Sequence, residues 1–407
     1  MSSLFPGPLR DRDGAARVTP FELFFDLVFV FAVTQLSHRL LEHLTPRGAA
    51  ETLLLLLAVW WAWMYTSWTT NWFDPDNQRN RIMLAGVMLA SMIMSASIPH
   101  AFDDGRALWF AGAYVAVQAG RTFYVVVVTR RHELGPNFRR IMVWIAVPAT
   151  VWIAGALVDD QARIWFWTAA VVLEYAGPWA GYRVPGLGRS RTTDWTIDGE
   201  HMAERCRLFT IIALGESLLI TGATFAGHDP TAATTLAMVQ AFLTAAAMWW
   251  LYFDRAADAA AELIAGSDDP GRLGRIAYTF VHLPMIAGII VTAVGDELVM
   301  AHPGGHVSGG TAAVVLGGPA LFVFGHALFK RVVFGHLTAV RVTAVLALAA
   351  LGLTYSFVTP LFLACASTAV MVILAVWDVL TVRAFLRRQQ SEAEAGIVAV
   401  TPSGGPS

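Results

Sequence analysis

The stretch FELFFDLVFVFAVTQL, from Phe21 to Leu36, is apolar enough to enter a lipid bilayer, yet it holds two carboxylates, Glu22 and Asp26. Residues four apart lie on one face of a helix, so both acids point the same way. An acidic residue near the centre of a membrane helix costs about 2.5–3.5 kcal/mol. We therefore expect the rest of the chain to supply partners for these two acids inside a helix bundle.

Composition places the chain among membrane proteins. Of its 407 residues, 56% are hydrophobic and only 14% are charged, with a mean hydropathy of +0.55, whereas soluble domains have about 25% charged residues. The net charge of −2 gives no sign of a nucleic-acid partner. The first apolar run lacks a cleavage site and continues at transmembrane length, so no cleavable signal peptide is expected. Cys206 and Cys365 lie far apart in predicted helices and imply no disulfide framework.

Hydropathy predicts an all-α polytopic membrane protein with about 12 transmembrane helices. We expect a cytoplasmic leader, a first six-helix repeat, a cytoplasmic linker, a second six-helix repeat and a disordered cytoplasmic tail, at residues 1–19, 20–183, 184–200, 201–388 and 389–407. The predicted helices of the first repeat are 20–41, 51–73, 82–100, 107–128, 141–158 and 163–182. Those of the second are 204–226, 232–253, 276–296, 311–329, 337–357 and 360–382.

The basic residues indicate the orientation. If the N-terminus is cytoplasmic, twenty-three of the 28 Lys and Arg residues lie in cytoplasmic segments. Four lie on the other side, namely Arg39, Arg47, Arg106 and Arg163, and the remaining one, Arg121, lies within a helix. Because basic residues concentrate in cytoplasmic loops, both termini are expected to be cytoplasmic.

The two halves resemble each other weakly. Trp60-Trp61 in the second segment matches Trp249-Trp250 in the eighth, and each pair is followed shortly by a tyrosine. The third and ninth segments both open on Arg-Ile, and the fourth and tenth share a glycine followed by a basic-type residue. Six helices in each half would make the repeats parallel, related by an axis along the membrane normal.

Several segments place ionisable side chains in the cytoplasmic half of the membrane. At a rise of about 1.5 Å per residue, Arg121 lies about 12 Å from the cytoplasmic side, Glu174 about 13 Å and Glu216 about 16 Å. Glu22 and Asp26 lie closer to that side. Since Arg121 is the basic residue deepest within a helix, we expect it to pair with Asp26 or Glu174.

These charges have two interpretations. Ion pairs inside a membrane can simply lock helices together, or they can serve a transport pathway. Glu216 has no arginine at its depth, because Arg205 lies about 16 Å away along the same helix, so Glu216 is a candidate for reversible protonation. The isolated histidines His201, His282 and His326 are interpreted as hydrogen-bonded packing or interface residues.

The tryptophans of the second segment also have two interpretations. They either line a substrate cavity or serve as interfacial and packing residues, and they are Trp60, Trp61, Trp63, Trp68 and Trp72.

Enzyme motifs are mostly missing from the sequence. Gly215-Glu216-Ser217 lacks the second glycine of a nucleophile elbow, and no phosphate loop or Cys/His cluster is recognisable. His201 and Glu204 share a helix face, but two ligands are weak support for a metal site. We expect no enzymatic activity, no cofactor and no metal.

Two stretches resemble the signatures of a known family. RVTPFELFFDLVFVFAVTQLSH and HMAERCRLFTIIALGESLL are similar to the two motifs of the bacterial low temperature requirement protein A (LtrA) family, and the Trp-rich segment followed by Asn71, Asp74, Arg79 and SIPHAF also fits. The resemblance covers essentially the whole chain. It implies a multi-pass protein of the bacterial inner membrane, named for a growth requirement in the cold, and brings no substrate. By motif match, the family's marked positions are Glu22, Asp26, Gln35, His201, Glu204, Arg205, Gly215 and Glu216.

A fainter similarity links FFDLVFVFAVT to the FSD-type first helix of endolysosomal and bacterial potassium channels, whose longer members carry two six-helix repeats. Residue 25 is Phe rather than Ser, and the seventh segment lacks the motif.

Three functions remain as hypotheses. The first is a proton-coupled secondary transporter of unknown substrate; the second is a cation channel of the potassium type; the third is a scaffold or lipid-related protein of cold adaptation. The expected partners are the lipid bilayer, a proton or cation, and a second copy of the chain in a homodimer. The candidate pathway residues are Asp26, Glu22, Arg121, Glu174, Glu216, Gln35, Glu204, Arg205 and His201.

Overall fold

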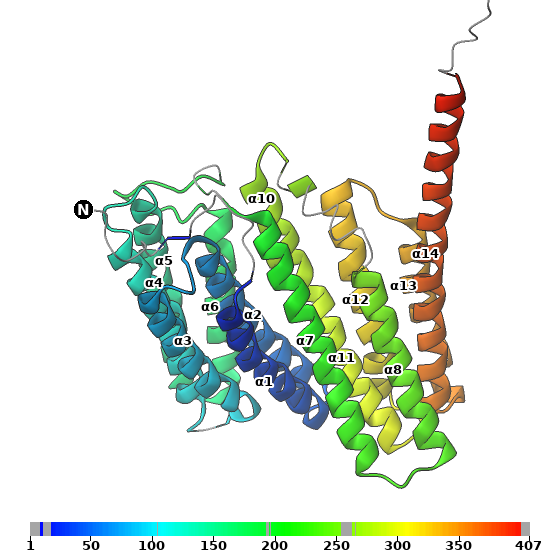
Figure 1. The fold of residues 1–407 in the computed structure, drawn as a ribbon. Coiled ribbons are helices and arrows are strands. Elements are labelled where there is room, and N and C mark those ends of the chain that lie inside the picture. The colour runs from blue at the N-terminus through cyan, green and yellow to red at the C-terminus, as the bar shows by residue number, and fades with distance from the viewer. Residues whose placement is uncertain are drawn as a thin grey trace, which may run out of the picture.

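The computed structural model describes residues 9–10, 18–103, 105–192, 195, 197–253, 263–264 and 266–399, with side chains up to residue 381. Within these residues the regular structure is helical, and strand geometry is limited to two isolated bridges. Long helices follow one another along the chain (Figure 1). The predicted all-α class is therefore confirmed.

Each predicted segment corresponds to a helix of the structure. The first half contains α1 (Pro20–Glu42), α2 (Pro46–Trp72), α3 (Gln78–Ala96), α4 (Ala107–Val128), α5 (Gly135–Ala156) and α6 (Asp160–Trp179). The second half contains α7 (Gly199–Ala226), α8 (Ala232–Tyr252), a compound helix (Pro270–Ala301), α12 (Gly309–Phe334), α13 (Ala339–Leu351) and α14 (Pro360–Ala399). The compound helix joins α10 (Pro270–Gly274), the π-helical segment η3 (Arg275–Val281) and α11 (His282–Ala301).

Ten of the described helices are long and apolar enough to cross a membrane. The two long helices outside this group are α3 and α6, of 19 and 20 residues. Polar residues lower their hydropathy, since α3 opens on Gln-Arg-Asn-Arg and α6 carries Arg163 and Glu174. Both still pack inside the same bundle, α3 against α1 and α4, and α6 against α5.

Polar caps define where α1 and α7 begin. At the start of α1, Thr19 and Glu22 form a capping box, which satisfies backbone donors of the first turn. Before α7, Asp198 Oδ1 accepts a hydrogen bond from the His201 amide at 3.0 Å. As a result α7 begins at Gly199 rather than near residue 204, and its first turns are polar.

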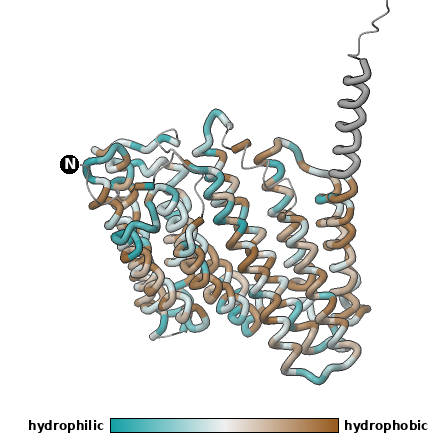
Figure 2. The backbone as a smooth tube through the Cα atoms, viewed as in Figure 1, coloured by the Kyte–Doolittle hydropathy of each residue, from teal (hydrophilic) through white to brown (hydrophobic). Residues whose placement is uncertain are grey.

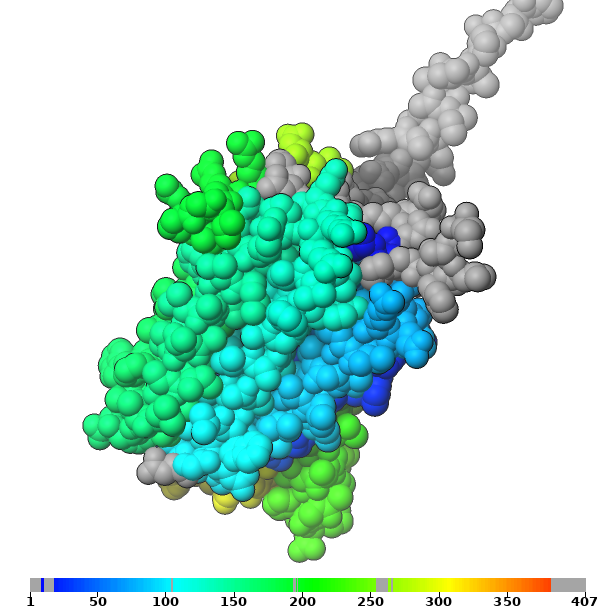
Figure 3. Space-filling model, turned by 90° about the vertical axis from the view of Figure 1, so that its left-hand side faces the viewer, coloured from blue at the N-terminus to red at the C-terminus, as the bar shows by residue number. Residues whose placement is uncertain are grey.

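The two halves lie next to each other (Figure 1). In the first half α1 packs on α2 and α3, and α3 to α6 then pack in sequence. In the second half α7 packs on α8 and α11, and α11 to α14 then pack in sequence. The halves meet where α1 contacts α7 and α11 and where α2 contacts α7. Figure 3 views the outer face of the first half, which α3 to α6 cover in cyan and green.

One end of the bundle, at the top of Figure 1, holds the starts of α1, α3, α5 and α7 and the ends of α2, α4 and α6. We call it the Arg-rich face because its segments carry Arg10, Arg79, Arg81, Arg130, Arg131, Arg139, Arg140, Arg183, Arg189 and Arg191. Apolar residues run along the helices and hydrophilic residues occupy connections at both ends (Figure 2). Large apolar side chains such as Phe24 and Leu27 are exposed, as on a surface that faces lipid. The chain is a multi-pass membrane protein.

The ends of the chain add detail to the prediction. α14 continues to Ala399, into the segment predicted to be a disordered tail; the sequence there contains Ser-Glu-Ala-Glu-Ala, rich in good helix formers. Residues 400–407 lie outside the described part. In the leader, the Arg10 amide donates to the Trp72 carbonyl at 2.9 Å, which holds this part of the leader against the end of α2.

The tryptophan pairs that suggest a repeat differ in their surroundings. Trp60 and Trp61 are 1% and 3% exposed, whereas Trp249 and Trp250 are 45% and 50% exposed. The same motif therefore packs inside the protein in the first half and faces outward in the second.

Candidate functional site

The two acids of the first helix find their partners on α7. Glu22 Oε1 lies 2.8 Å from His201 Nε2, and Glu22 Oε2 accepts from Arg10 Nη2 at 3.2 Å. Arg205 Nη2 donates to Asp26 Oδ1 at 2.7 Å, and Arg205 Nη1 donates to the Glu22 carbonyl at 2.9 Å. We call Glu22, Asp26, His201 and Arg205 the acid–arginine cluster; all four side chains are buried.

The prediction that Arg121 pairs with Asp26 is wrong, because Arg205 takes that place. Hydropathy alone starts the seventh helix near residue 204, which puts Arg205 at the membrane surface. The Asp198 cap starts α7 at Gly199, so Arg205 lies about two turns inside the helix. His201, predicted to be a hydrogen-bonded packing or interface residue, lies inside the bundle for the same reason and bonds Glu22, as predicted.

The end of α2 closes the cluster from a third side. Trp63 Nε1 donates to Asp26 Oδ1 at 2.8 Å, and Arg205 Nη2 donates to Ser67 Oγ at 3.3 Å. The other carboxylate oxygen of Asp26, Oδ2, is buried and has no hydrogen-bond partner among the described residues. Asp26 therefore has one fully bonded oxygen and one that is available.

Asn71 fixes the state of the histidine. Asn71 Oδ1 accepts from the Asp198 amide at 3.0 Å, which orients the side-chain amide so that its nitrogen lies 3.2 Å from His201 Nδ1. The Asn71 nitrogen can only donate, so Nδ1 accepts. His201 then donates to Glu22 through Nε2, as a neutral imidazole.

Arg121 and Glu174 are connected indirectly, which corrects the prediction of a direct pair. Arg121 Nη2 donates to Gln118 Oε1 at 2.7 Å, and Arg121 Nη1 donates to Thr66 Oγ1 at 3.0 Å. Gln118 Nε2 donates to the Tyr114 hydroxyl at 3.1 Å, and that hydroxyl donates to Glu174 Oε2 at 2.5 Å. Tyr114, Gln118 and Arg121 share one face of α4. The two neutral side chains thus separate the charges.

Three further candidates lie on or near α1 and α7. Glu216 is half-buried, accepts a hydrogen bond from Thr34 Oγ1 on α1, and has no cation within ion-pair distance among the described residues. Glu204 Oε2 accepts from the Val18 amide at 3.4 Å. Gln35 is half-buried and has no hydrogen-bond partner within the described chain. Glu216 therefore shares the α1–α7 contact with the acid–arginine cluster.

The other two histidines are buried and hydrogen-bonded, as predicted. His282 Nε2 lies 2.9 Å from the Tyr252 hydroxyl. Arg341 Nε donates to His326 Nδ1 at 3.5 Å.

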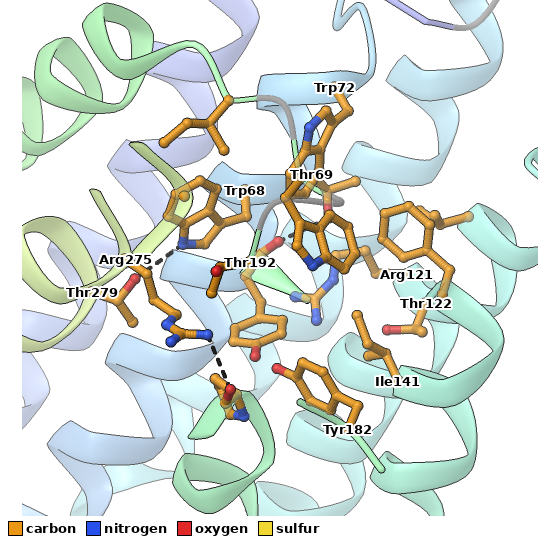
Figure 4. Close-up of a pocket in the computed structure, with 17 residues that line it drawn as sticks. Trp68, Thr69, Trp72, Arg121, Thr122, Ile141, Tyr182, Thr192, Arg275 and Thr279 are labelled. Atoms are coloured by element: carbon orange, nitrogen blue, oxygen red, sulfur yellow. Dashed lines mark hydrogen bonds between the residues drawn. The ribbon is translucent and has the colours of Figure 1, made fainter. Parts of the chain in front are cut away.

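A cavity of about 100 Å³ lies between the two halves at the Arg-rich face. We call it the interhalf cavity (Figure 4). Trp68 and Trp72 line it, whereas Trp60, Trp61 and Trp63 pack in the core. It is lined by Tyr65, Trp68, Thr69, Trp72, Arg121, Thr122, Val125, Phe138, Ile141, Pro178, Tyr182, Thr192, Trp195, Ile197, Gly271, Arg275 and Thr279.

Two arginines give the interhalf cavity its charge. Figure 4 shows Arg121 and Arg275 entering from opposite sides. Arg275 Nη1 donates to the Pro178 carbonyl at 3.0 Å, and its guanidinium lies 5.5 Å from the centre of the Trp179 ring. Neither arginine pairs with a described acid, and none of the described lining residues is acidic. The sequence prediction missed Arg275 because it counted this residue with the cytoplasmic loops.

α2 separates the cavity from the cluster. Trp63 and Ser67 face Asp26 and Arg205, whereas Trp68 and Trp72 line the cavity. These two sets lie on different faces of the same helix end. A shift of α2 would therefore change the surroundings of both the acid–arginine cluster and the interhalf cavity.

Side chains of α2 also bind the π-helical segment η3 of the compound helix. In a π-helix the carbonyl of residue i pairs with the amide of residue i+5, and for Thr279 that residue is Pro284, which has no amide hydrogen. Trp60 Nε1 instead donates to the Thr279 carbonyl at 2.6 Å, and Trp68 Nε1 donates to Thr279 Oγ1 at 3.0 Å. Two tryptophans of the first half thus fix a segment of the second half that lines the cavity.

Replacing Trp60 by Phe is expected to lower the free energy of unfolding by about 1–3 kcal/mol, because the buried Thr279 carbonyl loses its donor. Unfolding of the purified protein in detergent micelles measures this loss. Trp250→Phe is the matched control, since Trp250 is half exposed on α8. Equal stability of the two variants would contradict this role for the Trp60 indole.

The second half holds buried polar groups that the sequence prediction did not consider. Gln240 Nε2 donates to Asp296 Oδ1 at 2.7 Å, and Asp378 on α14 pairs with Arg341 and lies 3.7 Å from Lys330 Nζ. The sequence signal that could have identified Asp296 and Asp378 is the one that marks Asp26, namely an acid within an apolar run.

Comparisons with known proteins support the motif resemblance. The model of a family described as bacterial low temperature requirement A protein (LtrA) matches residues 17–376. An uncharacterized protein of Rhizobium meliloti (strain 1021) is 36% identical over 369 residues, which cover 90% of each chain. No solved structure matches. The matched range contains both signature stretches and the whole acid–arginine cluster, so the predicted resemblance is confirmed.

Proposed function

The chain belongs to the bacterial low temperature requirement A protein (LtrA) family. We propose that it is a proton-coupled secondary transporter of the inner membrane. The interhalf cavity is its substrate site, and Asp26 carries the coupled proton. Growth at low temperature would then depend on the movement of a solute across the membrane.

The observation that carries this proposal is the position of the interhalf cavity between the halves. α2, α4 and α5 line one side, and the compound helix lines the other. Transporters built from repeats bind substrate where the repeats meet, and open the site to each side in turn by rocking one repeat against the other. The same order of helix neighbours in both halves supports such a repeat.

The end of α2 couples the protonation of Asp26 to the substrate site. It contacts Asp26 and Arg205 through Trp63 and Ser67, and it contacts the interhalf cavity through Trp68. Protonation of Asp26 neutralises the partner of Arg205, which weakens the bonds that hold α2 between α1 and α7. The movement of α2 then changes the walls of the cavity.

The contact between α1 and α7 supplies a second proton site. Thr34 lies two turns beyond Asp26 on α1, about 12 Å along the helix, and it binds Glu216. A proton that enters from the face opposite the Arg-rich face meets Glu216 first and Asp26 next.

The alternatives fit these features less well. A cation channel would have to conduct past Arg121 and Arg275, which repel cations. A scaffold offers no explanation for a cavity between the halves that two arginines line.

Asp26→Asn is expected to reduce substrate-driven proton flux at least about tenfold, since the amide cannot take up a proton at neutral pH. Proteoliposomes that contain purified protein and a trapped pH-sensitive dye report the flux when the small-molecule fraction of a bacterial extract is added outside. Asp76→Asn is the control, because Asp76 is exposed and pairs with Arg81 at the surface.

Three outcomes would contradict the proposal. They are the absence of any extract-driven proton movement in the unmodified protein, full activity of Asp26→Asn, and a steady ion current that needs no solute gradient. The last outcome would favour the channel.

A further inference from the structure

Asp296 is a buried acid that the proposed function does not use. It lies on α11, it is 7% exposed, and its Oδ1 accepts a hydrogen bond from Gln240 Nε2 on α8 at 2.7 Å. Among the described residues, no arginine, lysine or histidine lies within ion-pair distance of it. A carboxylate inside a membrane protein is costly unless something compensates its charge. The structure therefore raises the question of which cation Asp296 meets.

A cavity of about 10 Å³ lies beside this acid, where α8, α11, α12 and α14 pack together (Figure 1). We call it the Asp296 cavity, and its polar lining consists of the side chains of Gln240, Thr244, Thr292, Asp296 and Ser367. The described parts of the four helices cover this region without a gap. Asp296 lies about 8 Å from the end of α11, so the cavity is inside the membrane, near the face opposite the Arg-rich face.

The hydroxyls of the Asp296 cavity present lone pairs rather than hydrogens. Thr292 Oγ1 donates to a backbone carbonyl of α11 at 2.7 Å, and Ser367 Oγ donates to the Val315 carbonyl at 3.3 Å. The Thr244 hydroxyl has a backbone acceptor on its own helix at 3.1 Å. A hydroxyl has one hydrogen and two lone pairs. These oxygens therefore remain as acceptors, which suits a cation and not an anion.

Pro319 adds a backbone oxygen to the lining. In an α-helix the carbonyl of residue i pairs with the amide of residue i+4, and for Val315 that residue is Pro319, which has no amide hydrogen. Val315 and Pro319 both line the cavity. Ser367 on α14 donates to the Val315 carbonyl, which keeps a second lone pair. Carbonyls without an intrahelical partner are among the groups that coordinate Na⁺ in membrane transporters.

Size and charge select the ion. A volume of about 10 Å³ is about the least that admits one water molecule, so an ion enters without its water shell. Bare Na⁺ is smaller than a water molecule and K⁺ is about as large, whereas Mg²⁺ usually keeps several waters. Ca²⁺ takes about six to eight oxygens, and the described lining contains one carboxylate.

Transition metals fit this lining poorly. They favour imidazole and thiolate ligands, and the described residues contain no group of three His, Cys, Asp or Glu side chains that could hold a metal. A single carboxylate surrounded by neutral oxygens balances one positive charge.

We infer that the Asp296 cavity binds one Na⁺ ion, with the Asp296 carboxylate, the hydroxyls of Thr292 and Ser367 and the Val315 carbonyl as its ligands. The ion neutralises the charge of the lining and joins α11, α12 and α14. The site does not rest on the proposed transport function, because Asp296 belongs neither to the acid–arginine cluster nor to the interhalf cavity. A water molecule beside a protonated carboxylate is the competing occupant.

Binding of radioactive Na⁺ to the full chain in detergent micelles tests the site directly. Saturable binding of one ion per chain is expected, and unlabelled Na⁺ should displace it at least about tenfold more effectively than K⁺. The absence of saturable binding would overturn the inference. Equal displacement by Na⁺ and K⁺ would overturn the choice of ion.

Variants locate the bound ion. Asp296→Asn is expected to weaken Na⁺ binding at least about tenfold, and its amide oxygen can still accept from Gln240, which favours folding. Asp229→Asn is the matched control, because Asp229 is exposed in the connection before α8, at the same face. Unchanged Na⁺ affinity of Asp296→Asn, or an equal loss in Asp229→Asn, would overturn the assignment. Ser367→Ala tests the same ligand set if Asp296→Asn fails to fold, and unchanged affinity there would also count against it.

Thermal unfolding at equal ionic strength separates the two occupants. A ligand that binds only the folded state raises the unfolding temperature, so the unmodified protein should unfold at a higher temperature in NaCl than in KCl or N-methylglucamine chloride, and Asp296→Asn should not. Equal unfolding temperatures of the unmodified protein in all three salts would assign the cavity to water and overturn the inference. Na⁺ binding by protein without extract-driven proton flux supports the site and contradicts the transporter, whereas flux without Na⁺ binding overturns the site alone.

Discussion

Replacing Arg205 by Met is expected to lower the free energy of unfolding by about 3–5 kcal/mol, because the Asp26 carboxylate then stays buried without its partner. Both side chains are inaccessible, and the bond between Arg205 Nη2 and Asp26 Oδ1 is 2.7 Å long. Trp63 continues to donate to the same oxygen, but a single neutral donor does not balance a buried charge. Unfolding in lipid–detergent micelles by increasing dodecyl sulfate measures the loss.

The paired variant Asp26→Leu with Arg205→Met tells a structural ion pair from a functional one. Replacing both partners of a buried pair by apolar residues is often nearly neutral, so we expect this variant to recover most of the stability that Arg205→Met loses. The part that is not recovered reflects Trp63, whose indole loses its acceptor. We also expect the paired variant to lose substrate-driven proton flux.

An exposed pair provides the control for this experiment. Arg81 and Asp76 are joined at 2.6 Å, and both side chains are half exposed. Removing both should change the free energy of unfolding by less than about 1 kcal/mol. If the paired variant of Asp26 and Arg205 is stable and still moves protons normally, the acid–arginine cluster is a structural lock and the coupling role is wrong.

How much of this cluster the sequence predicts depends on helix boundaries. Two acids in an apolar helix predict buried partners, and Glu22 and Asp26 do have them. The identity of the partner was predicted wrongly because hydropathy sees only apolar runs. The Asp198 cap and the polar first turns of α7 extend the helix beyond such a run. Arg205, which hydropathy assigns to a loop, therefore lies in the core.

The interhalf cavity depends on contacts that no local pattern contains. The sequence left open whether the tryptophans of α2 line a cavity or pack, and the structure divides them: Trp68 and Trp72 line the cavity, and the other three pack in the core. Arg121 and Arg275 come from different halves, and they line one cavity only because the halves pack together. The π-helical segment, which begins at Arg275, also receives a hydrogen bond from an indole of the other half, at the Thr279 carbonyl. Such pairings follow from tertiary packing, which propensity and hydropathy do not encode.

Replacing Gly318 by Ala is expected to lower the free energy of unfolding by about 3 kcal/mol, at the upper end of the range for overpacking. A Cβ at Gly318 would lie 2.6 Å from the backbone nitrogen of Thr292, on the facing helix α11. A Cβ at Gly288 on α11 would lie 2.8 Å from the Gly318 carbonyl oxygen, so the two helices touch backbone to backbone here. Small residues allow this close approach between membrane helices.

Gly317→Ala is the control that isolates this contact, because a Cβ there meets nothing within 4 Å. Alanine is a better helix former than glycine by about 0.5–1 kcal/mol, so Gly317→Ala should leave stability unchanged or raise it. Opposite effects at adjacent positions of one helix cannot come from propensity, which is the same at both. Unfolding of Gly318→Ala at the same dodecyl sulfate fraction as Gly317→Ala would contradict the close approach of α11 and α12. The packing of α11 on α12 would then not be what holds the π-helical segment, which precedes α11, beside the interhalf cavity.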